Sequence, residues 1–362
     1  MSRILFIALA TYNRVGGLQN FNRRLIRNLD GLVAEGSLSS CRVHIMDDTA
    51  ADLPQMSHAN VTGFGRNRLK FITESLSAVR TCDQLIVGHV NLVPVACLLK
   101  ALKPSLKITL FVHGDEVWND VLRQKHVYEP WLLKAVDRVA SVSAYTADVM
   151  SREYGVPRAR FVIYPNVVDD FADPPQRPLD TATVLCVTRI GPGDRRKNVD
   201  RLIEAMGVLA QRGRPGRLVV VGGGALREEY EALAAAKGIA DRVEFTGRIS
   251  DEELNQRYAG ADLFALPSSK EGFGIVYLEA WSHGLPVICS CRGAPHEIVS
   301  DGVDGFVVDE TDVDTFADRI DAILSDPERA ARMGRAGLTK VRENYLNGRV
   351  YEGLRQLLVE AR

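Results

Sequence analysis

Short, nearly continuous apolar runs alternate with helical patterns along the whole chain, and this alternation restricts the fold most strongly. Strands of a parallel sheet that helices cover on both faces need apolar side chains on both sides. In the first half the runs are Ile4–Leu9, Leu85–Val87, Ile108–Val112, Val139–Val142 and Phe161–Ile163. In the second half they are Ala182–Val187, Leu218–Val221, Val243–Phe245, Leu263–Leu266, Val287–Ile288 and Phe306–Val308. The pattern predicts an α/β protein with parallel sheets.

A segment rich in proline, Asp169–Pro178, separates the two halves and predicts an interdomain linker. A chain of 362 residues is long enough for two domains of ordinary size. We therefore predict two Rossmann-like domains, at residues 1–168 and 169–343. From about Pro327 the chain is predicted to be helical to its end, and the apolar side chains of residues 344–362 need a surface to cover.

Composition narrows the class of protein. Apolar residues make up 46% and charged residues 25% of the chain, which are values of a globular protein. The net charge of −1 argues against nucleic acid as a partner. Six cysteines without a Cys-x-x-Cys pair predict free thiols in a reducing cytoplasm. No apolar stretch approaches the ~20 residues that span a bilayer, and Arg3–Ala10 predicts a first strand rather than a signal sequence.

Residues 268–280 have the strongest features of a ligand site. An apolar strand ends before them at Pro267, and a helix is predicted from about Ile275 to His283. The turn between them contains two glycines and would expose backbone N–H groups at a helix N-terminus, which attract phosphate. Glu271 lies in this turn, where it can face polar groups of a ligand. Glu279 follows after seven intervening residues, and its carboxylate could accept two hydroxyls of a ribose.

The two glutamates and their spacing resemble the Glu-x7-Glu signature of retaining glycosyltransferases of family four. The resemblance covers nearly the full chain and is strongest in residues 187–309. It implies the GT-B fold, in which two Rossmann-like domains face a central cleft and a C-terminal helix, here 344–362, crosses back to the first domain. The first domain would bind the acceptor and the second the nucleotide sugar. Pro165–Asp169 is similar to the interdomain element of the family, with valine where glycine is usual.

Arg189 and Lys197 flank a loop with two glycines that follows a predicted strand. A diphosphate there would meet a guanidinium and an ammonium group, although a solvated basic loop is the alternative. The resemblance implies that these two side chains bind the donor diphosphate. It further implies donor contacts from the turn at Gly222, from the backbone of Arg248 and Ile249 near the nucleobase, and from the backbone of Gly274 and Ile275 to phosphate. At Gly222, a tight turn from strand to helix is the alternative that the residues favour.

In the first domain, His113 follows the predicted strand Ile108–Val112, at the end where open α/β sheets bind ligands. A structural hydrogen bond is the alternative for a single histidine. The resemblance implies that His113 contacts the transferred sugar and that Glu271 binds hydroxyls of the same sugar, so these two residues are the predicted catalytic pair. Gly16 and Gly17 follow the first strand and would let the backbone approach the donor, unless they form only a tight turn.

Neither a metal nor a cofactor is predicted. Asp312-Val313-Asp314 has the D-x-D form that some sugar transferases use to hold a metal ion. These aspartates open a predicted helix, however, where they would cap it and favour its dipole. No histidine or cysteine cluster has the spacing of metal ligands. The resemblance implies that Arg189, Lys197 and the helix N-terminus at Ile275 neutralise the leaving diphosphate instead.

Cations in the first half predict a candidate surface for lipid head groups or a polyprenyl diphosphate. Residues 1–170 carry 20 Lys and Arg against 16 Asp and Glu, a net charge of +4. The clustered cations are Arg23, Arg24, Arg27, Arg66, Arg68 and Lys70. We therefore consider peripheral contact with an anionic membrane on its cytoplasmic face, with a solvated basic surface as the alternative that the sequence favours. Loops such as Met46–Arg68 would select the acceptor.

These features predict a retaining, metal-independent glycosyltransferase. It would move a hexose from a nucleotide-diphosphate sugar to a hydroxyl of a saccharide or a polyprenyl-linked saccharide. The family implies a place in bacterial polysaccharide or cell-envelope glycan synthesis. Three alternatives remain open: a GT-B nucleotide-sugar epimerase, a phosphorylase with a pyridoxal-bearing lysine, and a non-catalytic nucleotide-sugar-binding protein. Sugar turnover without an acceptor would identify the first, and an absorbance spectrum of the cofactor would identify the second.

Overall fold

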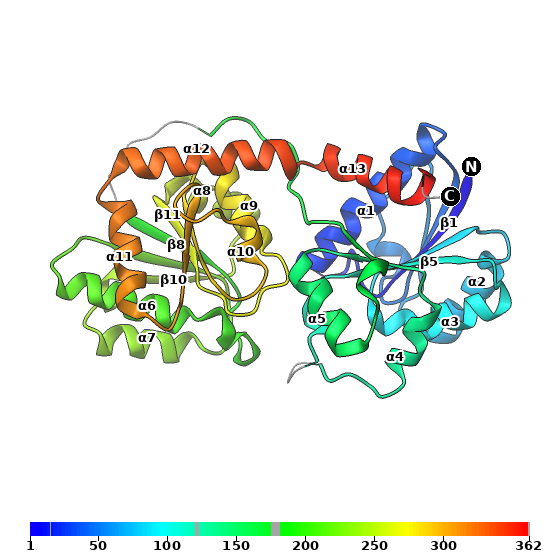
Figure 1. Cartoon of the computed structure of the whole chain (residues 1–362), viewed down its shortest axis with the longest axis horizontal. Coiled ribbons are helices and arrows are strands. Elements are labelled where there is room, and N and C mark those ends of the chain that lie inside the picture. Colours follow the sequence, from blue (N-terminus) through cyan, green and yellow to red (C-terminus); the bar gives the residue numbers. More distant parts are fainter. Residues whose placement is uncertain (15, 120–122, 175–181, 361–362) are drawn as a thin grey trace. The chain divides into compact units, whose positions relative to one another are not determined.

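The structure is a computed structural model that describes residues 1–14, 16–119, 123–174 and 182–360 (Figure 1). The chain divides into two compact units. Unit 1 comprises Met1–Asn166 and Gly348–Arg362, and unit 2 comprises Val167–Asn347. Residues 175–178 of the expected linker lie outside the described residues.

Unit 1 contains a seven-stranded parallel sheet in the order β3-β2-β1-β4-β5-β6-β7. Its strands are β1 (Ser2–Ala8), β2 (Leu38–Ile45), β3 (Asn60–Gly63), β4 (Gln84–Val87), β5 (Lys107–Val112), β6 (Arg138–Ser141) and β7 (Phe161–Ile163). Its α-helices are α1 (Gly17–Ala34), α2 (Arg68–Val79), α3 (Val93–Leu102), α4 (Glu129–Leu132), α5 (Ala144–Tyr154) and α13 (Asn347–Arg355), whose first residue belongs to unit 2.

Unit 2 contains a six-stranded parallel sheet in the order β10-β9-β8-β11-β12-β13. Its strands are β8 (Thr183–Val187), β9 (Arg217–Val221), β10 (Val243–Gly247), β11 (Leu263–Leu266), β12 (Val287–Ser290) and β13 (Gly305–Val308). Its α-helices are α6 (Val199–Gln211), α7 (Arg227–Ala236), α8 (Asp251–Gly260), α9 (Ile275–Ser282), α10 (Pro295–Ile298), α11 (Val313–Leu324) and α12 (Pro327–Asn344).

The fold class predicted from the apolar runs is confirmed, because both units are α/β structures with parallel sheets. Most residues of the central strands are buried. In β1, Ile4–Ala8 have no exposed surface, and in β11 no residue is more than 2% exposed. Helices from the connecting segments cover these strands, which is why the strands carry apolar side chains at consecutive positions.

Two strands of unit 1 were not predicted. β2 contains Ser39, Ser40 and Arg42 between its apolar residues, and β3 is a short polar strand at the edge of the sheet. Neither has the continuous apolar run that marks a strand buried on both faces, so the criterion missed them. β3 also lies within Met46–Arg68, which is therefore not only loop.

The helical tail is interrupted, whereas the sequence predicted helical structure from about Pro327 to the end. α12 ends at Asn344, and the next two residues leave the helix to meet Val168. The backbone N–H of Val168 donates to the carbonyl of Tyr345 at 2.9 Å, and Val168 forms a parallel bridge with Leu346. Beyond this break, the chain is tied into unit 1. The hydroxyl of Tyr164 donates to the carbonyl of Val350 at 3.1 Å.

Helix α12 packs closely against the end of α9. A Cβ atom at Gly337 would lie 1.9 Å from Cδ1 of Trp281, and one at Gly334 would lie 1.8 Å from the carbonyl oxygen of Gly284. Trp281 is fully buried, and its indole N–H donates to the carbonyl of Asp304 at 2.9 Å. The two glycines let α12 approach and fix α9, which carries Glu279.

Candidate active site

The strand order of unit 2 defines where a ligand can bind. From β8 the chain proceeds to β9 and β10 on one side, and then returns to β11, β12 and β13 on the other. Because all strands are parallel, their carboxyl ends share one edge of the sheet. In open α/β sheets, ligands bind outside this edge at the point where the order reverses. Here that point lies between β8 and β11.

Lys197 and Glu271 meet at this reversal point. Lys197 ends the 3₁₀ turn Pro192–Lys197 after β8, and Glu271 belongs to the loop after β11. The Nζ atom of Lys197 lies 2.6 Å from Oε2 of Glu271, and both side chains are about one-fifth exposed. Two residues 74 positions apart, each predicted for the donor site, therefore form a direct ion pair.

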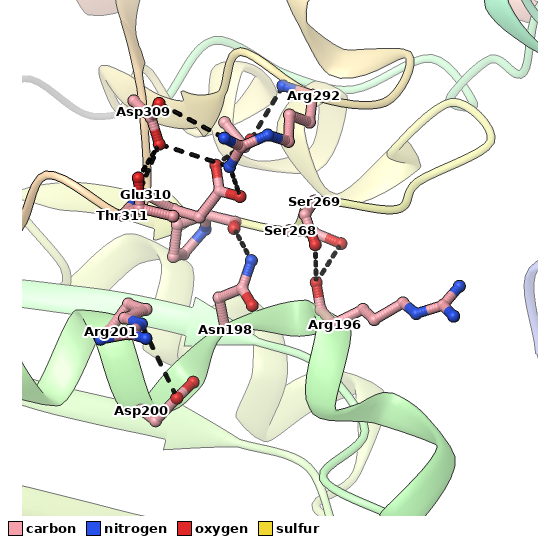
Figure 2. A network of polar contacts seen from close by, with 12 residues as sticks. Arg196, Asn198, Asp200, Arg201, Ser268, Ser269, Arg292, Asp309, Glu310 and Thr311 are labelled. Atoms are coloured by element: carbon pink, nitrogen blue, oxygen red, sulfur yellow. Dashed lines mark hydrogen bonds and ion pairs between the residues drawn. The ribbon is translucent and has the colours of Figure 1, made fainter.

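Further hydrogen bonds hold the two loops together, as Figure 2 shows. The backbone N–H of Ser269 donates to the carbonyl of Arg196 at 2.9 Å, and the hydroxyls of Ser268 and Ser269 point to the same oxygen. The amide of Asn198 donates to the carbonyl of Pro267 at 2.7 Å. These bonds fix the position of the lysine relative to the glutamate before any ligand binds.

Arg189, the second predicted diphosphate ligand, lies just after β8. Its side chain is 70% exposed, and its guanidinium lies 3.1 Å from Oδ1 of Asp194. Asp194 also accepts the backbone N–H of Gly191 at 3.2 Å. The loop after β8 thus carries both predicted cations, Arg189 paired with an aspartate and Lys197 paired with Glu271.

The turn before α9 requires glycine at position 274. Gly274 has a φ of 89°, and a Cβ atom there would lie 2.5 Å from the ring of Tyr277 and 3.3 Å from Cγ of Glu271. The Tyr277 hydroxyl is itself fixed by a bond to the carbonyl of Leu266. α9 starts at Ile275, so its first N–H groups face the turn that carries Glu271.

Glu279 lies on α9 and is held by a residue that was not predicted. The hydroxyl of Tyr258, on α8, donates to Oε2 of Glu279 at 3.0 Å. Tyr258 is 1% exposed. No sequence spacing marks this contact, because it joins two helices across the packed interior of unit 2.

Gly222, Arg248 and Ile249 lie after β9 and β10. Gly222 has a φ of 134°, and its N–H donates to the carbonyl of Gly247 at 2.9 Å. Arg248 is exposed and Ile249 is partly buried. A Cβ atom at Gly223 would lie 3.5 Å from Cγ of Arg248, so the arginine stem passes beside the glycine turn.

A second set of residues missed by the sequence analysis supports Glu271 from the side of β12. The backbone N–H of Ala294 donates to the carbonyl of Glu271 at 2.9 Å. The loop that contains Ala294 is anchored by Ser290, whose hydroxyl donates to Glu310 at 2.6 Å, and by Arg292, which pairs with Asp309 and Glu310 (Figure 2).

We expect Glu310→Ala to lower the free energy of unfolding by about 1–3 kcal/mol, because the buried Ser290 hydroxyl loses its acceptor. Denaturant unfolding measures the change. Asp309→Asn is the matched control: Asp309 is half exposed, and asparagine keeps an oxygen for Thr311, so its cost should stay below about 1 kcal/mol. Equal effects of the two substitutions would contradict the assignment of Glu310 as the anchor.

The remaining predicted residues belong to unit 1. Gly16 precedes α1 and has an extended backbone, and Gly17 is its first residue. A Cβ atom at Gly17 would meet nothing within 4 Å, and one at Gly16 would meet only the end of the flexible Gln19 side chain. The packing of unit 1 therefore does not itself require glycine at either position. Val15, between these glycines and β1, lies outside the described residues.

His113 follows β5, as predicted. Its ring packs edge-on against Phe21 of α1, with centroids 4.6 Å apart. Its Nε2 atom is buried and has no hydrogen-bond partner among the described residues. Burial lowers the pKa of His113 to about 3, so the ring is neutral at physiological pH. The carboxylate of Glu116 accepts the backbone N–H of His113, and burial raises the pKa of Glu116 to about 7.

The D-x-D sequence has the structural role expected for it. Asp312 caps α11 by accepting the N–H of Thr315 at 3.1 Å, and Asp314 lies 2.9 Å from the guanidinium of Arg212. Within the described ranges, no group of three His, Cys, Asp or Glu side chains is placed to hold a metal ion. Across the same ranges, no helix combines the length and apolarity needed to cross a bilayer.

Comparison with known proteins identifies the family. The family described as "Glycosyl transferases group 1" matches residues 168–340, and "Glycosyltransferase Family 4" matches residues 15–170. A GDP-mannose-dependent monoacylated alpha-(1-6)-phosphatidylinositol monomannoside mannosyltransferase of Corynebacterium glutamicum is 30% identical over 352 residues, 91% of this chain and 90% of that protein. The chain belongs to glycosyltransferase family 4.

Two further similarities agree with this assignment. A GDP-mannose-dependent alpha-(1-6)-phosphatidylinositol monomannoside mannosyltransferase of Mycolicibacterium smegmatis is 37% identical over 248 residues, and the match spans 64% of each protein, slightly under two thirds. The structure of sucrose-phosphate synthase from Thermosynechococcus elongatus matches with a TM-score of 0.78 and 22% identity, over 99% of this chain and 98% of that one. The fold is therefore GT-B, as the sequence predicted.

Proposed function

We propose that the protein is a retaining glycosyltransferase that takes mannose from GDP-mannose and transfers it to a hydroxyl of a glycolipid or saccharide acceptor. The observation that carries the proposal is the ion pair of Lys197 and Glu271 at the reversal point of the sheet. It places a cation suited to a diphosphate beside a carboxylate suited to sugar hydroxyls. Because a transferred sugar is bonded directly to the diphosphate, a group for each must lie close to the other.

Each part of the donor has a candidate partner in unit 2. Glu279 would accept the ribose hydroxyls, and Arg189 with Lys197 would bind the diphosphate. The backbone of Gly274 and Ile275 would add N–H donors to the phosphate at the start of α9. Glu271 would bind hydroxyls of the sugar. The turn at Gly222 and the backbone of Arg248 and Ile249 would lie toward the nucleobase, because they follow the neighbouring strands β9 and β10.

In unit 1, His113, Gly16 and Gly17 remain the candidate ligand contacts. The buried Nε2 atom of His113, without a partner among the described residues, supports a role in binding a ligand hydroxyl, since such an atom gains a hydrogen bond when the ligand arrives. The neutral ring can donate or accept according to its tautomer. At Gly16 and Gly17, the packing leaves space for a ligand to approach the backbone.

In the proposed reaction, the bond between the anomeric carbon and the diphosphate oxygen breaks, and the acceptor oxygen bonds to the same face of that carbon. The acceptor proton leaves with the diphosphate. Lys197 and Arg189 stabilise the charge that grows on the leaving group, without a metal ion or cofactor. The contribution of the protein is positioning and electrostatic stabilisation.

The names of two relatives support GDP-mannose as the donor and a phosphatidylinositol mannoside as the type of acceptor. A lipid-linked acceptor agrees with contact to an anionic membrane, for which Arg66, Arg68 and Lys70 remain candidates because their side chains are exposed. Arg23 has another use, since its guanidinium donates to the carbonyls of Thr11, Tyr12 and Arg14.

Nucleotide-dependent stabilisation tests the donor site. At about 100 times its dissociation constant, GDP should stabilise the wild type by about 2.7 kcal/mol and raise Tm by a few degrees. We expect Glu279→Ala to lose most of this rise at the same concentration, because the ribose hydroxyls lose their acceptor. UDP is the control for the base, and Glu328→Ala, at a highly exposed carboxylate of α12, is the control for the substitution.

If neither GDP nor UDP stabilises the wild type, the donor site is wrong. If GDP binds, transfer from GDP-mannose should be followed with mannosylated lipid and saccharide acceptors, and the anomeric configuration of the product should be read by nuclear magnetic resonance. A product with inverted configuration would exclude the retaining reaction. Sugar turnover in the absence of acceptor would indicate an epimerase.

A further inference from the structure

Tyr258 makes a contact that orients the carboxylate of Glu279. Tyr258 lies on α8, 21 positions before Glu279, and its hydroxyl donates to Oε2 of the carboxylate at 3.0 Å. A glutamate side chain has three rotatable bonds, so without such a contact its carboxylate would sample several directions. The bond from Tyr258 selects one of them.

Tyr258 can perform this role because it is itself fixed. Its side chain is 1% exposed, and its ring stacks on His283 with centroids 5.0 Å apart and planes 17° apart. His283 follows the end of α9, and its Nδ1 atom lies 2.9 Å from the carbonyl oxygen of Glu279 in that helix. The glutamate is thus held at both its carboxylate and its backbone by two rings that pack on each other.

The charge states suit this arrangement. Burial first, and the neighbouring Glu279 carboxylate second, raise the pKa of Tyr258 well above its ordinary value. The hydroxyl therefore stays protonated and donates throughout the physiological pH range. An ionised carboxylate has about four acceptor positions on its two oxygens. A bond from Tyr258 is therefore compatible with further bonds from ligand hydroxyls.

We propose that Tyr258 is a positioning residue for the nucleotide, whose hydroxyl holds Glu279 in the orientation that accepts the two ribose hydroxyls. This proposal rests on the donor site proposed above. It predicts an effect specific to one part of the ligand, because Tyr258 acts on the ribose through Glu279 and not on the diphosphate or the base.

The test compares GDP with 2′,3′-dideoxy-GDP by calorimetry. In the wild type, removal of the ribose hydroxyls should weaken binding by at least about tenfold, since hydrogen bonds to charged groups typically contribute that much. In Tyr258→Phe, which keeps the ring and its stacking, GDP should bind about tenfold more weakly, while the Kd of the dideoxy nucleotide should stay the same. In this variant, the ratio of the Kd of the dideoxy nucleotide to the Kd of GDP should therefore fall toward one.

Glu279→Gln should show the same loss of discrimination. Tyr230→Phe is the matched control, since Tyr230 is a buried tyrosine of the same unit, on α7. It should retain the full preference for the ribose hydroxyls. In transfer assays, Tyr258→Phe should raise the KM for the donor more than it lowers kcat. If Tyr258→Phe only disturbed the packing, it would weaken the binding of both nucleotides equally and would lower the Tm of the protein without ligand.

The outcomes separate the two proposals. If Glu279→Gln loses the ribose preference and Tyr258→Phe keeps it, the positioning role is wrong and the donor site stands. If wild type binds no nucleotide, or binds both forms equally, the donor site fails and the positioning role fails with it. If Tyr258→Phe does not fold, Tyr258→4-aminophenylalanine keeps a hydrogen-bond donor of similar size and should preserve the preference for the ribose hydroxyls, whereas a loss of that preference would overturn the positioning role.

Discussion

Replacement of Lys197 by alanine is expected to lower kcat by about 10²–10³, the usual cost of removing one charged donor from a site that stabilises a developing anion. Lys197 ends the turn after β8, and its ammonium lies 2.6 Å from Glu271. When the diphosphate leaves the sugar, its negative charge grows, and the lysine interaction is stronger in the transition state than in the ground state. Initial rates with saturating donor and acceptor measure the effect.

Arg195→Ala is the matched control for this prediction. Arg195 lies on the same turn but pairs with Glu229, and its side chain is 57% exposed. Its removal should change kcat by less than about threefold, because exposed ion pairs contribute little. Lys197→Ala also leaves Glu271 without its cation, so the double variant with Glu271→Gln should be compared. If the two residues act as a unit, the double variant should be little worse than the poorer single variant. Unchanged turnover in Lys197→Ala would refute the diphosphate assignment.

Replacement of Gly222 by alanine is expected to lower the free energy of unfolding by about 2 kcal/mol or more. Two causes add. The φ of 134° lies in a region that side chains rarely adopt, and the new Cβ atom would lie 1.9 Å from the carbonyl oxygen of Thr188. The backbone of the turn after β9 would have to move away from β8. Thermal and denaturant unfolding should both register the loss.

Gly223→Ala provides a control one residue away. At Gly223 the nearest atom to an added Cβ would be Cγ of Arg248 at 3.5 Å, which is ordinary van der Waals contact. Its effect on stability should stay within about 0.5 kcal/mol. A tolerated Gly222→Ala would mean that the turn can relax and that glycine is not required there by the fold.

The sequence predicted individual residues of the proposed donor site but not the contacts between them. Lys197 and Glu271 were both predicted, because each follows an apolar strand and precedes a helix. Their ion pair depends on the strand order β9-β8-β11, which brings segments 74 positions apart to one edge. Strand order follows from long-range packing, and the local patterns that mark each strand carry no information on which strands are neighbours.

Two residues whose side chains bond to Glu279 and Ser290 were not predicted, for the same reason. Tyr258 and Glu310 are single polar residues within ordinary helical or loop sequence, and neither belongs to a recognisable spacing. Their partners, Glu279 and Ser290, are 21 and 20 positions away and lie on different elements. Only burial at under 5% exposure, together with a hydrogen bond, distinguishes them from solvated side chains.

By itself, the sequence determined the α/β class, two parallel sheets and the segments that end each central strand, because strands buried on both faces need consecutive apolar residues. It also carried the glutamate spacing that resembles the signature of the family. The tertiary structure decided the polar strands β2 and β3, the break in the tail at Tyr345, and the contacts that orient Lys197, Glu271 and Glu279. These features depend on hydrogen bonds and packing between distant segments, and such interactions leave no periodic pattern in the chain.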